Sequence, residues 1–159
     1  MDNEMKIRYA ARTVIYDNND KKIAVLEVKN GVYHKIPGGG VENNETIKDA
    51  AVREALEEGA CDVQLIAKIG EFEFAIPEPS NVINHSTCFL AKKIKDHTST
   101  SFTEEETSDN FKLLWLTIDE AIELFKNVKS KVSLELKMNN RDLGFIIAAK
   151  EYLENKNIN

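Results

Sequence analysis

The stretch over residues 37–61 constrains this chain most, because a run of glycines is followed there by an acidic helical segment. Three consecutive glycines at 38–40 come directly after a proline, so the backbone can turn tightly and approach a ligand closely. Thr46 is a good N-cap, and residues 47–58 are rich in Ala, Glu, Leu and Lys. Gly59 is a natural helix stop. The pattern predicts a glycine-rich turn and then a helix over 47–58.

Three carboxylates crowd one side of this helix near its C-terminal end. At 3.6 residues per turn, Glu54, Glu57 and Glu58 share a face. A like-charge pair at i,i+4 costs roughly 0.2–0.5 kcal/mol, and the helix dipole disfavours anions in the last turn. Arg53 supplies one counter-charge, and a hard divalent cation bound through oxygen could supply the rest. On these residues alone, an ordinary exposed acidic helix face is the alternative.

The wider spacing favours a functional site. Five residues separate Gly39 from Glu45, and seven more separate Glu45 from Arg53-Glu54-Ala55-x-Glu57-Glu58. This pattern resembles the signature box of the Nudix hydrolases, here at 39–61. The likeness extends over roughly residues 7–125, through the order of strands, box helix, acidic loop and tryptophan strand.

The resemblance implies a fold and an activity. It implies an α/β (α+β) fold, a Nudix-type α/β/α sandwich with a mixed β-sheet, formed as a single domain over 1–159. The implied activity is hydrolysis of a pyrophosphate bond in a nucleoside diphosphate derivative or nucleoside triphosphate, with Mg²⁺ or Mn²⁺ as cofactor. Divalent cations suit this chemistry because they neutralise charge on phosphate and lower the pKa of bound water.

The resemblance also assigns roles within the site. The metal ligands would be Glu54, Glu57, Glu58 and the carbonyl of Gly38; the catalytic residues would be Glu54, Arg53 and Glu57; Gly39 and Gly40 would approach the substrate phosphates, and Glu45 would support the site. Glu54 is the expected acceptor of the proton from water, with Arg53 orienting it. From the sequence alone, a helix-surface pair of Arg53 with Glu57 or Asp49 is an equal alternative.

The acidic segment before the tryptophan strand offers one further site residue. The candidates by position are Glu104, Glu105, Glu106 and Asp109, with Glu106 preferred. Farther from the box, Phe72 and Phe74 fall on one side of an expected strand. They could stack on a nucleobase or fill the core.

This chain departs from the family pattern at the end of the box. Ala60 stands where the family has its last glycine, and Gly59 comes one residue early. Alanine is strained at positive φ and glycine is not. We therefore expect the helix to end a residue sooner than in the family.

The remaining elements follow from periodicity and capping signals. Strands are expected over 5–16, 23–28, 32–36, 63–68, 71–76, 85–94 and 111–116, a turn at 17–20, a mobile loop over 96–110, a helix opened by the capping box of Thr117 and Glu120, and a last helix over about 140–154 capped by Asn140. Strands interrupted by a helix favour a mixed sheet with helices on both faces.

Charge and composition exclude several classes of function. The net charge of −6 argues against nucleic-acid binding, which needs a basic surface. The start of the chain has no secretion signal and no apolar run approaches ~18 residues, so we expect a cytoplasmic protein without a membrane span. Cys61 and Cys88 are expected to be small buried hydrophobes.

The expected partner is a small-molecule nucleotide substrate, and the resemblance leaves a homodimer open. Two rivals to an enzyme stay open. One is a catalytically silent Nudix-fold module that senses a nucleotide; the other is a non-enzymatic α/β domain with an acidic surface helix.

Overall fold

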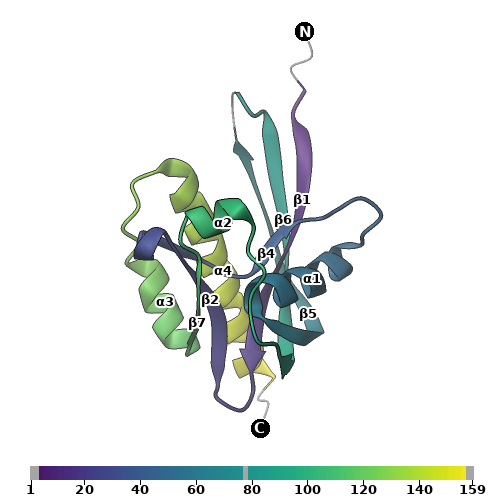
Figure 1. The fold of residues 1–159 in the computed structure, drawn as a ribbon, viewed down its shortest axis with the longest axis vertical. Helices are drawn as coiled ribbons and strands as arrows, with labels where there is room; N and C mark the ends of the chain where they lie inside the picture. Colours follow the sequence, from purple (N-terminus) through teal and green to yellow (C-terminus); the bar gives the residue numbers. More distant parts are fainter. Residues whose placement is uncertain (1–3, 77–78, 157–159) are drawn as a thin grey trace.

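A single seven-stranded sheet organises the chain, and helices cover both of its faces (Figure 1). The computed structural model describes residues 4–76 and 79–156. Its strands are β1 (Lys6–Asp17), β2 (Lys22–Val28), β3 (Tyr33–Lys35), β4 (Gly38–Gly40), β5 (Cys61–Ile76), β6 (Val82–Asp96) and β7 (Lys112–Leu116). Its helices are α1 (Ile47–Gly59), α2 (Glu104–Ser108), α3 (Ile118–Lys126) and α4 (Ser133–Asn155), with a 3₁₀ turn at Lys29–Gly31.

The sheet is mixed, as the sequence predicted. Its order is β3-β2-β1-β6-β5, with β4 also paired to β1 and β7 to β2. The central strands β1 and β6 are parallel over Lys6–Tyr16 and Val82–Lys92, and all other pairings are antiparallel. Helix α1 lies on one face, whereas α3 and α4 lie on the other (Figure 1).

The alternation of side chains along the strands explains these layers. Val14 and Val25 point to the face covered by α3 and α4, where Phe125 and Ile146 complete the core. The neighbouring residue Ile15 points to the opposite face, together with Ala24, Ala91 and the α1 residue Ala55. Small residues on the α1 side let the helix approach the sheet closely. Both cysteines are free and buried, as expected.

The segment over 96–110 contains a helix where the sequence predicted a mobile loop. The Thr103 hydroxyl accepts from the Glu106 N–H at 3.1 Å, and the Glu106 carboxylate accepts from the Thr103 N–H at 2.9 Å. This capping box starts α2. The acidic, Ser/Thr-rich composition suggested a loop, although the spacing of Thr103 and Glu106 is that of a capping box.

The last helix begins at Ser133, seven residues before the expected cap at Asn140. Its first turns bury polar side chains, so they lack the apolar stripe used to find a helix. The Asn139 amide, which is fully buried, donates to the Phe125 carbonyl at 2.9 Å and accepts from the His34 N–H at 3.2 Å. Tertiary hydrogen bonds therefore hold this part of α4.

The glycine run is a strand and not the expected turn. Gly38, Gly39 and Gly40 pair antiparallel with Arg12, Ala11 and Ala10 of β1. A Cβ on Gly38 would lie 2.6 Å from the Ala11 carbonyl oxygen, so only glycine allows this approach.

The box helix does not end early. Helix α1 includes Gly59, and Ala60 adopts the left-handed conformation with φ 51° and ψ 41°. Its N–H donates to the Leu56 carbonyl at 3.1 Å. Gly59 is needed for packing, since a Cβ there would lie 2.7 Å from Ile15 Cδ1. The expectation of a shorter helix was wrong. Tertiary packing requires glycine at position 59, inside the helix, and the left-handed position that follows is therefore occupied by Ala60.

Replacing Ala60 with glycine should stabilise the protein by about 0.5–1 kcal/mol. The left-handed conformation costs an L-residue roughly 1–2 kcal/mol, and the larger unfolded-state entropy of glycine offsets part of the gain. Urea unfolding should show a higher midpoint for Ala60→Gly and a lower one for Ala51→Gly, which lies inside the same helix. A lower midpoint for Ala60→Gly would contradict this explanation.

Candidate functional site

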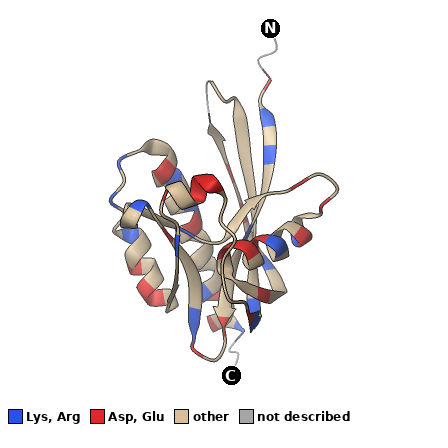
Figure 2. Cartoon of the chain, in the orientation of Figure 1, with Lys and Arg blue, Asp and Glu red and all other residues tan. Residues whose placement is uncertain are grey.

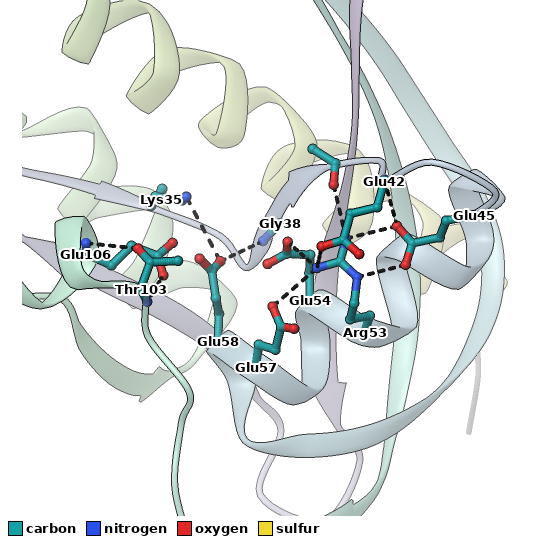
Figure 3. A network of polar contacts seen from close by, with 11 residues as sticks. Lys35, Gly38, Glu42, Glu45, Arg53, Glu54, Glu57, Glu58, Thr103 and Glu106 are labelled. Atoms are coloured by element: carbon teal, nitrogen blue, oxygen red, sulfur yellow. Dashed lines mark hydrogen bonds and ion pairs between the residues drawn. The ribbon is translucent and has the colours of Figure 1, made fainter.

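Arg53 on α1 joins the acidic residues of the site (Figure 3). Its Nε and Nη2 donate to the two oxygens of Glu45 at 2.7 and 2.9 Å, and Nη2 also donates to the Gly40 carbonyl at 3.0 Å. Its Nη1 donates to Glu54 Oε1 at 2.8 Å and to Glu57 Oε2 at 3.2 Å. The arginine therefore makes the helix-surface pair with Glu57 and the contact with Glu54 at the same time.

Burial and hydrogen bonding shift the pKa values of two carboxylates that Arg53 contacts in opposite directions. Hydrogen bonds from Arg53 lower the pKa of Glu45 to about 2, so Glu45 stays ionised and holds the guanidinium. Glu54 is only 8% exposed, and burial raises its pKa although Arg53 opposes the shift. Glu54 lies against β4, where a Cβ on Gly39 would fall 2.5 Å from its Oε1. The middle glycine of the run therefore makes room for this carboxylate.

Glu58 is the most deeply buried of the three helix carboxylates, at 1% exposure. Its Oε1 accepts from the Gly38 N–H at 2.9 Å and lies 4.0 Å from Lys35 Nζ. Its Oε2 is buried and has no hydrogen-bond partner among the described residues. Burial raises the pKa of Glu58 to about 8. An unpaired buried carboxylate oxygen is costly, so this atom is suited to a ligand.

Helix α2 brings a fourth carboxylate to the site. The side chain of Glu106 lies beside that of Glu58; burial works against ionisation of Glu106, but its interaction with Glu58 and the Thr103 N–H lower its pKa. The Ser101 N–H donates to the Glu57 carbonyl at 2.6 Å, which ties the segment before α2 to the end of α1. Both α1 and α2 carry acidic residues (Figure 2). Glu106, the candidate preferred from the sequence, is partly buried, whereas Glu104 and Glu105 are exposed.

The donor set fits a hard divalent cation. Across 4–76 and 79–156, no three His, Cys, Asp or Glu side chains are already gathered as a metal centre. Arg53 engages Glu54 and Glu57 instead. Nevertheless Glu58 keeps an unpaired buried oxygen and contacts Glu106, and carboxylate oxygens are the ligands that Mg²⁺ and Mn²⁺ prefer.

The structure also places cations near Glu58 that sequence reasoning missed. Lys35 lies beside Glu58, with its Nζ 5.3 Å from the centre of the Phe111 ring. Arg12 on β1 packs against Gly38 and interacts electrostatically with Glu58. An arginine inside the apolar run Ala10-Ala11-Arg12-Thr13-Val14 was the available signal, because a charged residue in a buried strand needs a partner.

The chain is similar in sequence and in fold to known proteins. The profile of the NUDIX domain matches residues 6–136. The chain is 30% identical over 122 residues to "Nudix hydrolase 16, mitochondrial" from Arabidopsis thaliana, a match that covers 68% of this chain and 66% of that protein. The chain thus spans about two thirds of the length of this relative.

Two solved structures show the same fold. A NUDIX hydrolase from Nitrosomonas europaea aligns with a TM-score of 0.63 and 18% identity, over 86% of this chain and 88% of that one. A structure described as an ADP compounds hydrolase aligns with a TM-score of 0.64 and 14% identity, over 94% of this chain and 74% of that one. At these identities the likeness concerns the fold alone.

Proposed function

This chain belongs to the Nudix hydrolase family, and on that premise we propose that it is a pyrophosphohydrolase. Its substrate would be a nucleoside diphosphate derivative or a nucleoside triphosphate. One observation carries the proposal: carboxylates from α1 and α2 converge beside the glycine strand, with a buried, unpaired oxygen on Glu58. Nudix hydrolases generally use divalent metal ions, and we propose Mg²⁺ or Mn²⁺ here.

The metal and the protein would divide the chemistry between them. Bound among Glu54, Glu57, Glu58 and Glu106, the cation would offset the charge that builds on the departing phosphate and lower the pKa of the attacking water. Glu54 would accept the proton of that water, because its raised pKa brings it closer to neutrality than an exposed glutamate. Arg53 would hold Glu54 in place. The carbonyl of Gly38 as a further ligand stays a prediction.

The first test is formation of the two products of pyrophosphate-bond cleavage, a nucleoside phosphate and the departing phosphate ester or pyrophosphate, from a nucleotide panel with Mg²⁺, with Mn²⁺ and with a chelator. The panel should contain nucleoside triphosphates, ADP-ribose, sugar nucleotides and dinucleoside polyphosphates. We expect turnover of at least one substrate, its loss in the chelator, and a decrease of about tenfold or more for Glu57→Gln. Glu42→Gln is the matched control, since Glu42 also lies near Arg53 but is exposed.

The outcomes separate the open alternatives. Tight nucleotide binding without turnover would replace the enzyme with a nucleotide-sensing module. If the protein neither binds nor hydrolyses any nucleotide of the panel, the proposal is overturned. The acidic helix would then be an ordinary surface helix.

We also propose that residues 1–159 act as one Nudix domain, of which the profile matches 6–136. None of the helices in the described residues combines the length and the apolar character that crossing a bilayer requires. The cytoplasmic location and a homodimer stay predictions.

A further inference from the structure

Two buried arginines on the α4 side of the sheet have unpaired hydrogen-bond donors. Arg12 on β1 is 6% exposed and Arg141 on α4 is 2% exposed. Arg12 Nε donates to Ser86 Oγ at 3.2 Å, and Arg141 Nε donates to Asp142 Oδ1 at 2.8 Å. Arg12 Nη1 and both Nη atoms of Arg141 are buried without a partner among the described residues. Buried guanidinium donors are normally satisfied, so these atoms require an acceptor.

The charges around the two arginines do not balance. Lys35 is a third cation in the cluster; Asp142 interacts with all three cations, and Glu58 interacts with Arg12 and Lys35. Asp142 has both oxygens engaged, one by Arg141 and one by the Ile36 N–H at 3.0 Å. Burial, and then the positive charge of Arg141, lower the pKa of Arg12 to about 10. The two guanidiniums thus repel each other electrostatically, and an anion would relieve this repulsion.

A groove of about 520 Å³ beside Arg141 has the character that an anionic ligand needs. It lies between β5 and the start of α4 and is lined by Phe72, Phe74, Lys131, Ser133, Leu136, Lys137, Asn140 and Arg141. None of these lining residues is acidic, although the chain as a whole carries a net charge of −6. The Arg141 guanidinium carbon lies 5.9 Å from the centre of the partly exposed Phe74 ring, which lines the same groove.

Arg12 also adjoins the proposed catalytic site. A Cβ on Gly38 would lie 2.6 Å from Arg12 Cγ, and the N–H of the same glycine binds Glu58. Arg12 and Glu58 therefore both lie against Gly38.

We propose that Arg12 and Arg141 form a buried anion subsite that binds a phosphate group of the substrate. The inference rests on the proposed function, because it identifies where the polyphosphate extends beyond the carboxylate site. Planar guanidiniums suit phosphate oxygens, to which each can donate two hydrogen bonds. The two are positioning residues that bind the substrate and take no proton from it.

The test measures binding of inorganic pyrophosphate in EDTA, by calorimetry at constant ionic strength. Without a divalent cation the carboxylates repel pyrophosphate, so binding reports on the arginines. We expect the wild type to bind and the dissociation constant to rise at least about tenfold in Arg12→Gln and Arg141→Lys, since a charge-assisted hydrogen bond is lost. Lys150→Gln, an exposed change on the same helix, should bind as the wild type does.

A second readout separates binding from a structural role. With a hydrolysed nucleotide, Arg141→Lys should raise KM about tenfold or more and change kcat by less than about threefold. If Arg12→Gln does not fold, Arg12→Lys keeps the charge and removes the planar fork. The proposed subsite is contradicted if the wild type does not bind pyrophosphate, or if folded variants bind it as the wild type does. The binding measurements in EDTA need no turnover. If no nucleotide of the panel is hydrolysed, the proposed function is overturned, but pyrophosphate binding by the two arginines is not.

Discussion

Glu54→Gln is expected to lower kcat by about 100-fold or more while the protein remains folded. General-base catalysis contributes typically 10²–10⁴-fold, and a glutamine amide cannot accept the proton of the attacking water. The side chains have nearly the same shape, so the space left by Gly39 is still filled. Burial already raises the pKa of Glu54, so neutralising it should not destabilise the fold.

The measurement is steady-state kinetics at saturating Mg²⁺ on the best substrate of the panel, with urea unfolding of the same samples. Glu42→Gln makes the same chemical change at a side chain 68% exposed and 3.8 Å from Arg53, and should retain kcat within about twofold. If Glu54→Gln keeps the wild-type kcat, Glu54 is not the general base.

Arg53→Lys is expected to lower kcat/KM by about 10–100-fold, although it conserves charge. Lysine has one donor group and cannot reach Glu45, Glu54, Glu57 and the Gly40 carbonyl together, as the guanidinium does. Loss of a residue that orients metal ligands typically costs 10–100-fold in metal affinity or activity.

A titration of activity with Mg²⁺ checks this prediction. If Arg53 positions the carboxylates, the concentration for half-maximal activity should rise in Arg53→Lys. The rise should be smaller in Glu45→Gln, which loosens one side of the guanidinium only. Lys48→Gln on the exposed side of α1 serves as control and should not change the titration. An unchanged Mg²⁺ dependence in Arg53→Lys would make Arg53 a surface ion-pair residue.

Local signals in the sequence sufficed for the box helix and for α3. Thr46 accepts from the Asp49 N–H at 3.0 Å, and Thr117 forms its capping box with Glu120. These hydrogen bonds join residues three apart, so the sequence contains all that they need. The spacing of Gly39 and the three glutamates likewise follows from helix geometry and a short connection.

The start of α4, the strand formed by the glycines and the conformation of Ala60 depend on distant contacts. Asn139 is held by Phe125 and His34, and Gly59 must be small because Ile15 of β1 packs on it. No short stretch of the sequence contains both partners of such a contact. Local propensity therefore predicted a shorter α4, a turn at the glycines and an earlier end of α1.

The sequence by itself determined the family, the mixed sheet and the identity of the helix carboxylates, because these follow from residue spacing and periodicity along one element. Only the tertiary structure decided which acidic residue of α2 reaches the site and that Arg12 and Arg141 are buried together. Those residues lie on separate elements, and their charges acquire a shared environment only when β1, α1, α2 and α4 pack around the glycine strand.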